Sequence, residues 1–165
     1  MIEGRVWKYG DDVNTDVIFP GKYTYQPMRP EEMAEHAMED LDPTFAKSVK
    51  PGDVVVAGKN FGCGSSREQA ATCLKAAGVA AVVAPSFSRI FFRNAINEGL
   101  PVIELAKGTE SMRTGDTVKI DFANGIVEHK GAKYAFPSLP PEVLGILEDG
   151  GLIAHVKKAL AKKAA

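Results

Sequence analysis

The sequence predicts an α/β fold in which a parallel βαβ core carries an added antiparallel β layer and C-terminal helices. In the middle of the chain, continuous apolar runs alternate with segments of helical periodicity, the pattern of parallel strands joined by right-handed crossovers. After residue 115, alternation of apolar and polar residues indicates antiparallel strands. The length of 165 residues and the 45% hydrophobic content suit a single domain over residues 1–165.

The N-terminal third is expected to hold only short elements. Alternation predicts a first strand, and turn-forming Gly, Asp and Asn residues end it. Pro30, followed by two glutamates, begins a short helix. In order, the expected pieces are a strand over 5–9, a turn over 10–16, an apolar segment over 17–21 that ends in Pro-Gly, a loop over 22–30, the helix from Pro30 and one more helical turn over 45–49.

The remaining elements divide into a parallel and an antiparallel group. The parallel strands are apolar throughout, as expected of strands covered on both faces. Gly78 and Gly99 are placed to end the two helices between them, and Ser86 is placed to cap the second helix. Asn124-Gly125 is a hairpin signal between alternating segments. The expected elements are strands over 54–57, 79–84 and 101–105, helices over 66–77 and 87–98, antiparallel strands over 115–122, 126–129 and 133–136, and helices over 141–148 and from 152 onward.

The composition excludes several classes of partner. The net charge is −1, and the only basic cluster is the set of four lysines in the last helix, so neither nucleic acid nor a membrane surface is expected to bind. No apolar run approaches the roughly 18 residues of a membrane span. The N-terminus lacks the apolar region of a signal peptide, and we expect the chain in the cytoplasm.

The stretch over residues 58–68 is the most informative part of the sequence. A strand there runs into a glycine-rich turn, and the turn opens a helix. Such a turn directs backbone N–H groups and the positive end of the helix dipole at whatever lies in front of it. Ser65, Ser66 and Arg67 add two hydroxyls and a guanidinium, and the whole suits a small anion such as a carboxylate.

Ser65 has two competing interpretations. With Glu68 it matches the capping box, so its hydroxyl could simply cap the helix. The functional interpretation notes that Gly62 and Gly64 permit close approach of a ligand to the backbone. Arg67 also lies at the wrong end of a helix for a cation, unless a bound anion accepts its forked hydrogen bonds.

A dinucleotide site is the alternative for the same glycines, because Gly62-x-Gly64 resembles half of that fingerprint. The third glycine position is occupied by Arg67, and the next strand ends in Val83-Ala84-Pro85 without the acidic residue that would bind a ribose. The partial match is therefore weak.

No metal site is expected in this chain. Cys63 and Cys73 fit a reducing compartment, and they are fewer than the roughly three or four thiolates that hold an iron–sulfur cluster. Cys63 is interpreted as a small neighbour of the turn rather than a nucleophile. The three histidines, His36, His129 and His155, have no metal-ligand spacing.

Three motifs together resemble the swivelling β/β/α domain of the aconitase superfamily. They are Asp-Asp-Val-Asn-Thr-Asp over 11–16, Asn-Phe-Gly-Cys-Gly-Ser-Ser-Arg-Glu over 60–68 and Ser-Phe-Ser-Arg-Ile-Phe-Phe-Arg-Asn over 86–94. The resemblance covers nearly the whole chain, and its Gly-x-Gly-Ser-Ser-Arg-Glu motif is highly specific. The free-standing length resembles the small subunits of isopropylmalate dehydratase and homoaconitase-type enzymes.

The resemblance implies a two-subunit hydro-lyase that removes and re-adds water on a hydroxy-dicarboxylate. A large subunit would bind a [4Fe-4S] cluster, whose iron acts as a Lewis acid, and this chain would be active only with that subunit. Ser65 would be the catalytic base, while Ser66 and Arg67 would bind a substrate carboxylate. Gly62 and Gly64 would support the site, their N–H groups stabilising the Ser65 alkoxide as an oxyanion hole does.

Asp16 is expected to support the site by pairing with a charge, and a simple Asx turn is the equal alternative. Arg89, Arg93 and Asn97 share one helix face at i, i+4 and i+8. That face is interpreted by default as a solvated face, and contact with the large subunit or with the site is the alternative.

In such small subunits the loop after the Pro-Gly turn selects the side group of the substrate. Tyr23, Thr24 and Tyr25 are therefore expected to bind substrate. An Arg in this loop would suit a third carboxylate, but Tyr25 stands there, with Lys22 and Arg29 as the nearby cations. This favours a 3-isopropylmalate dehydratase of leucine biosynthesis. Homoaconitase, citraconate hydratase and 2,3-dimethylmalate dehydratase remain open, as does a non-catalytic anion-binding module.

Overall fold

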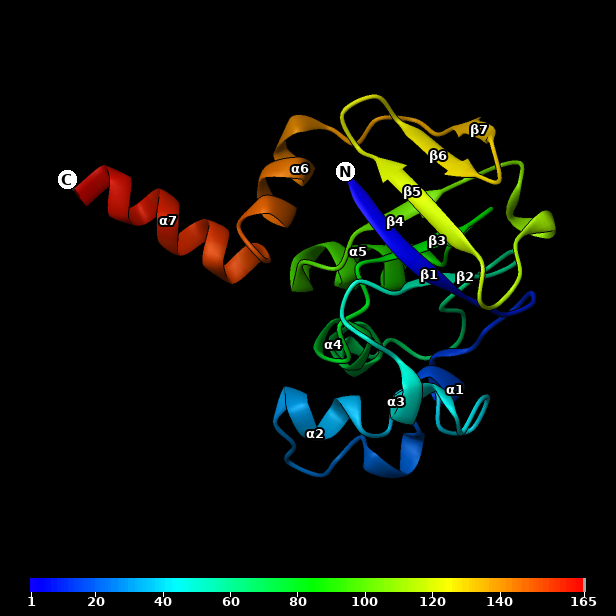
Figure 1. Cartoon of the computed structure of the whole chain (residues 1–165). Coiled ribbons are helices and arrows are strands. Elements are labelled where there is room, and N and C mark those ends of the chain that lie inside the picture. The colour runs from blue at the N-terminus through cyan, green and yellow to red at the C-terminus, as the bar shows by residue number, and fades with distance from the viewer. Residues whose placement is uncertain (165) are drawn as a thin grey trace.

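The computed structural model describes residues 1–164 and contains one mixed sheet of seven strands in the order β4-β3-β2-β1-β5-β6-β7 (Figure 1). β1 joins the two halves, because it pairs parallel with β2 and antiparallel with β5. The strands are β1 (Ile2–Lys8), β2 (Val54–Val56), β3 (Ala81–Ala84), β4 (Val102–Glu104), β5 (Thr117–Asp121), β6 (Ile126–His129) and β7 (Ala132–Ala135).

The sheet curls so that its antiparallel half lies over one face of its parallel half (Figure 1). Val54 and Val83 of the parallel strands and Val118 and Val127 of the antiparallel strands belong to one buried cluster between the halves. The added β layer that the sequence predicted is confirmed. It continues the parallel sheet through β1 instead of starting a separate sheet.

Helices cover the other face of the parallel strands, where a second cluster holds the apolar sides of α4 and α5. The short helices of the N-terminal third lie beneath α4 (Figure 1). The helices are α1 (Thr15–Ile18), η1 (Gly21–Tyr23), α2 (Pro30–Ala34), α3 (Phe45–Ser48), α4 (Glu68–Ala76), α5 (Arg89–Glu98), η2 (Thr109–Ser111), α6 (Pro141–Glu148) and α7 (Leu152–Ala164).

The start of α5 differs from the prediction. Ser88, not Ser86, caps α5, and its hydroxyl accepts from Phe91 N. The Ser86 hydroxyl instead accepts from Asn60 N at 2.8 Å, because the segment before α5 is held extended by a bridge between Phe61 and Phe87. The residues after strand β3 are thus tied to the turn before α4.

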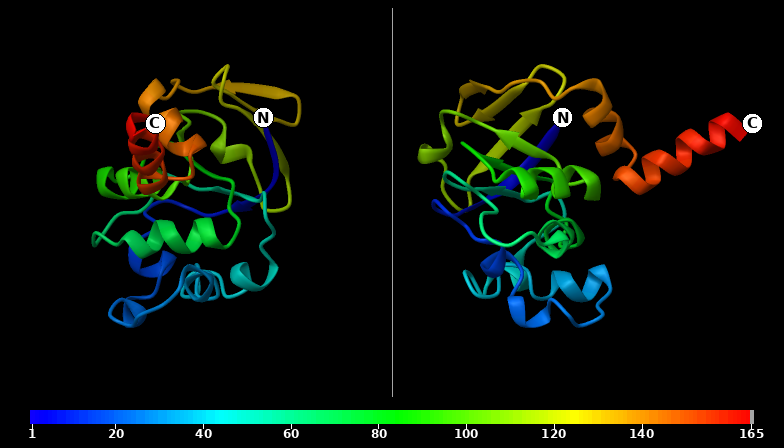
Figure 2. Two further views of the ribbon diagram at one scale, coloured as in Figure 1. Left: turned by 90° about the vertical axis from the view of Figure 1, so that its left-hand side faces the viewer. Right: turned by 180° about the vertical axis from the view of Figure 1, so that it is seen from behind.

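α7 projects from the body of the molecule (Figures 1 and 2). None of its residues is buried, and Ile153, Val156 and Leu160 expose their apolar side chains. Within residues 1–164, no helix combines the length and the apolar character needed to cross a membrane.

Candidate functional site

The predicted site lies where the parallel strands end. β2 leads into the turn over 58–67, β3 leads into the segment before α5, and β1 leads into the segment over 9–16. The carboxyl ends of parallel strands meet at one edge of a sheet, which is where open α/β sheets bind ligands. Bridges from Asn14 to Cys63 and from Phe61 to Phe87 join the three segments there.

Two glycines give the turn its shape. Gly62 and Gly64 have φ angles of 81° and 94°, in the left-handed region that side chains disfavour. A Cβ on Gly64 would lie 2.7 Å from the side-chain amide of Asn14, and one on Gly62 would collide with Phe91. The turn therefore requires glycine at both positions, for the close packing as well as for the backbone angles.

Ser65 is exposed, and its hydroxyl makes no hydrogen bond within residues 1–164. Two hydrogen bonds from Thr15 anchor the backbone around it: Thr15 N donates to Cys63 O at 2.8 Å, and Thr15 Oγ1 donates to Ser65 O at 2.8 Å. α4 begins at Glu68, with Arg67 as its N-cap residue and no side-chain cap. The interpretation of Ser65 as the helix cap is therefore wrong, because the anchored turn stays extended beyond it.

A run of backbone donors lies on both sides of Ser65 along the chain. In the part of the chain that the structure describes, the N–H groups of residues 64–69 have no acceptor. They precede and begin α4, so the positive end of the helix dipole adds to them. This arrangement can bind an anion or stabilise an oxyanion at the Ser65 side chain.

Arg67 stands beside the turn with 16% of its side chain exposed. Its Nη1 lies 2.5 Å from Asp16 Oδ1 and 3.4 Å from the carbonyl of Phe19. The chain at Gly21 runs close to the guanidinium, so that a Cβ there would lie 3.1 Å from Nη1. The guanidinium is thus oriented by one carboxylate, and its Nε and Nη2 donate to no acceptor within residues 1–164, so they can bind a second carboxylate.

The Asx turn and the charge pair considered for Asp16 are both present, while its support of the site stays a prediction. Its backbone N–H donates to Asn14 Oδ1 at 2.8 Å, which caps α1, while its carboxylate pairs with Arg67. Asn14, Thr15 and Gly21 were not predicted as site residues. Asn14 could have been found as the helix-capping residue type in the motif over 11–16.

The loop after Gly21 reaches the site only in part. The Tyr23 ring stacks on His36 with 4.0 Å between centroids, and Gln69 of α4 donates to Thr24 O at 3.3 Å. Tyr25 is 97% exposed and therefore makes almost no contact. Lys22 turns to Glu39, whose carboxylate lies 3.7 Å from its ammonium. The structure brings Tyr23 and Thr24 to the helices beside the turn and leaves the Tyr25 ring in solvent.

The remaining candidates are the two cysteines and three polar residues of α5. Cys73 is buried in α4, where burial raises the pKa of its thiol, so it is not a nucleophile. Cys63 is half-buried, and both cysteines are free. No group of three His, Cys, Asp or Glu residues from Met1 to Ala164 is placed to hold a metal ion. Arg89, Arg93 and Asn97 line a separate pocket along α5.

Comparison with known proteins gives consistent matches. A profile of the aconitase C-terminal domain family matches residues 12–108. The chain is 51% identical over 160 residues to 3-isopropylmalate dehydratase small subunit 1 of Thermotoga maritima, with 96% of each chain covered. It is 52% identical over 157 residues to small subunit 2 of the same enzyme from Archaeoglobus fulgidus, with 94% of each covered.

The fold has a solved counterpart in the crystal structure of 3-isopropylmalate dehydratase from Methanocaldococcus jannaschii. The TM-score is 0.92 at 44% sequence identity, and the match covers 99% of this chain and 97% of that one. The chain therefore belongs to the aconitase C-terminal domain family and, within it, to the small subunits of 3-isopropylmalate dehydratase.

Proposed function

We propose that this chain, paired with a large iron–sulfur subunit, converts 2-isopropylmalate to 3-isopropylmalate in the leucine biosynthesis of the cytoplasm. One observation carries the chemistry: the unbonded Ser65 hydroxyl lies in a run of free N–H groups beside Arg67. A base and a carboxylate-binding group are the two things that such a reaction needs from this half of the site.

Ser65 is the proposed base. Its deprotonated oxygen takes a proton from the methylene carbon next to a substrate carboxylate, and the C–H electron pair forms the double bond as the neighbouring C–O bond breaks. The departing hydroxide becomes water by taking a proton from solvent, to which Ser65 returns the proton that it accepted. Rehydration reverses these steps with opposite placement of proton and hydroxyl. A serine alkoxide is costly in water, and the N–H groups of Gly64 and its successors would lower that cost.

Ser66 and Arg67 are the proposed carboxylate ligands. Ser66 is exposed next to the base, and Arg67 offers forked donors that a carboxylate accepts in pairs. Asp16 would hold the guanidinium at the correct angle, while Gly62 and Gly64 fix the turn. The substrate is thereby oriented with its methylene carbon toward Ser65.

The side group of the substrate is proposed to lie against Tyr23, Thr24 and Tyr25. The two cations near this loop pair with neighbouring glutamates, Lys22 with Glu39 at 3.7 Å and Arg29 with Glu32 at 2.9 Å. A third carboxylate would therefore find no partner here, which supports an isopropyl group over the substrate of homoaconitase. Citraconate hydratase and 2,3-dimethylmalate dehydratase act on smaller side groups and are the other candidates.

The iron–sulfur cluster is assigned to the large subunit. Of the two thiols of this chain, one is buried in α4, so the chain offers no ligand set for a cluster. When bound in the partner, the cluster supplies the Lewis acid for the departing hydroxyl.

Anaerobic reconstitution tests the proposal. The chain alone should be inactive, and mixing it with its large subunit should give turnover of isopropylmalate faster than of homocitrate or citramalate. Faster turnover of homocitrate would show that the proposed substrate is wrong. Binding of dicarboxylates without any turnover by the pair would instead support the non-catalytic anion-binding module.

A further inference from the structure

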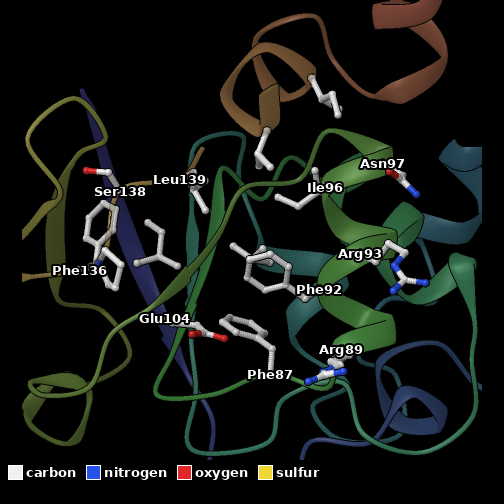
Figure 3. A pocket seen from close by; sticks show the side chains of 15 residues that line it. Phe87, Arg89, Phe92, Arg93, Ile96, Asn97, Glu104, Phe136, Ser138 and Leu139 are labelled. Carbon is white, nitrogen blue, oxygen red and sulfur yellow. The ribbon is translucent and has the colours of Figure 1, made fainter. Parts of the chain in front are cut away.

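A pocket of about 550 Å³ lies between α5, the strand β4 and the segment over 136–139, apart from the turn that carries Ser65. Phe87 and Phe92 line it, and so do Val143 and Ile146 of α6. Figure 3 shows Arg89, Arg93 and Asn97 in a row along α5, with Glu104 across the pocket. The pocket thus has an apolar lining, with two arginines along α5 and one carboxylate, that of Glu104, opposite them.

We propose that this pocket, which we call the α5 groove, anchors the large subunit by taking an apolar segment of it that is flanked by carboxylates. The proposal rests on the proposed function, because that function requires the second subunit. It assigns to Arg89 and Arg93 the ion pairs at the rim of the interface.

The groove is continuous with the surface that the partner must cover. Phe87 and Arg89 lie at one end of it, and their segment is bonded to the reactive turn, with Ser88 N donating to Phe61 O at 3.0 Å and Phe61 N donating to Ser86 O at 3.1 Å. A partner that brings its cluster to Ser65 therefore reaches the open end of the groove.

The apolar area that a subunit interface needs also favours the α5 groove. A stable interface buries about 800 Å² on each partner, with an apolar core inside a polar rim. The turn over 62–66 consists of glycine, serine and one cysteine, and it cannot supply that core. The neighbouring groove can, and Ile90 beside it, 47% exposed, extends the apolar surface.

Electrostatic repulsion disfavours a second copy of this chain as the occupant of the groove. The exposed apolar stripe of α7 is the obvious apolar helix on a second copy. It carries four lysines, Lys157, Lys158, Lys162 and Lys163, which would meet the guanidinium groups of Arg89 and Arg93. Like charges across an interface are repulsive, so an occupant with carboxylates fits better.

The test compares Arg93→Glu and Val143→Asp with the control Lys133→Glu, an exposed reversal on β7 outside the groove. Each folded variant is titrated anaerobically with the large subunit, and the dissociation constant is measured by calorimetry. The two groove variants should bind about tenfold or more weakly, and the control should bind as the wild type does. Arg93 is exposed, so its variant keeps the test valid if Val143→Asp fails to fold.

Unchanged affinity of Arg93→Glu would overturn the proposal. The proposal would also be overturned if Arg93→Glu paired with the large subunit as the wild type does but lost self-association of the small subunit alone, measured by sedimentation. The occupant of the α5 groove would then be a second copy of this chain. Turnover is measured separately on the wild-type pair. If that pair forms without acting on isopropylmalate, the proposed function fails, while the dissociation constants still decide the role of the groove.

Discussion

Ser65 and Arg67 are two residues apart and stand in different surroundings. The Ser65 hydroxyl is exposed and unbonded within the described residues, whereas the Arg67 guanidinium is mostly covered and held by Asp16. A reactive group needs access to substrate, and a binding group needs a fixed direction. The turn provides both because its backbone is anchored and its side chains are not.

Replacing Ser65 by Ala should lower kcat of the reconstituted pair by about 10²- to 10⁴-fold, the usual contribution of a positioned base. The hydroxyl bonds to nothing within residues 1–164, so the midpoint of urea unfolding and the affinity for the large subunit should not change. Ser48→Ala, at another exposed serine, is the control. Near-normal turnover by Ser65→Ala would remove the residue from the mechanism.

Replacing Asp16 by Asn should raise KM by about tenfold and change kcat less, because Arg67 loses the charge that orients it and binds the carboxylate less well. Arg67→Lys should raise KM further, since an ammonium cannot fork. Asp40→Asn, at an exposed carboxylate distant from the turn in sequence, should leave both constants unchanged. Equal KM values for Asp16→Asn and Asp40→Asn would show that the ion pair has no role in binding.

At the scale of elements, the strongest constraint is on the turn between β2 and α4. Gly64→Ala places a side chain at a φ of 94° and against Asn14. The backbone strain should lower the free energy of unfolding by about 1–3 kcal/mol, and the displaced turn should lower kcat as well. Gly10→Ala is the matched control, because a Cβ there meets nothing within 4 Å. Urea unfolding and steady-state rates measure the two effects, and a stable, active Gly64→Ala would contradict both.

Asp53 joins β1 to the turn before β2. Its buried carboxylate accepts from Trp7 Nε1 at 2.9 Å, Arg5 Nη2 at 3.0 Å and Lys50 N at 2.9 Å. Burial by itself raises the pKa of this carboxyl, but the bonds from Trp7, Lys50 and Arg5 outweigh it and hold the pKa below its ordinary value of 3.8.

Because the folded pKa is lowered, the carboxylate stabilises the fold fully above pH 3.8, and this contribution is lost as the pH falls through the folded value. Asp53→Ala should therefore cost about 3 kcal/mol at pH 7, and less in more acidic solution. Urea unfolding at pH 7 and pH 3 measures the difference. Asp40→Ala should cost little at either pH, and a pH-independent loss in Asp53→Ala would refute the ionic role.

The sequence predicted the elements whose signal is local. The buried runs at 54–57 and 79–84 became β2 and β3, because continuous apolar stretches have few alternatives in a βαβ unit. The continuity of the sheet could not be read from the sequence, because it depends on the two-sided pairing of β1, Val6 with Val54 and Arg5 with Thr117. Such registers link residues far apart in the chain.

The site, too, was predictable where its signal is local and not where it depends on contacts between distant residues. The motif predicted that Ser65, Ser66 and Arg67 face one ligand, since they are neighbours in one turn. The start of α4 was misplaced by two residues, because the bond from Thr15 to Ser65 O, which keeps the turn extended, comes from a distant segment. The ion pair of Asp16 with Arg67 likewise exists only in the folded chain, so its partner could not be named beforehand.

At the scale of the whole molecule, α6 and α7 follow one another but differ in what they bury. Val143, Ile146 and Leu147 of α6 pack against the core, whereas α7 has no buried residue and projects from the body (Figure 2). Apolar burial is the main source of stability, so the two helices should contribute unequally. We propose that residues 1–165 form one domain to which α7 adds little.

A chain truncated after Gly151 should therefore unfold in urea in a single cooperative transition, with a free energy of unfolding within about 1 kcal/mol of the full chain. The polar side-chain contacts it loses are those of Lys158 and His155 with Asp149, at 3.0 Å and 2.7 Å, and such pairs at or near the surface contribute little. A second truncation, after Pro140, also removes the apolar face of α6 and uncovers the core beneath it. It should lose several kcal/mol, because each of the three partly buried side chains, Val143, Ile146 and Leu147, contributes about 1–2 kcal/mol. Equal losses in the two truncations, or two separate transitions in the full chain, would show that α7 belongs to the folded core or that the chain is more than one domain.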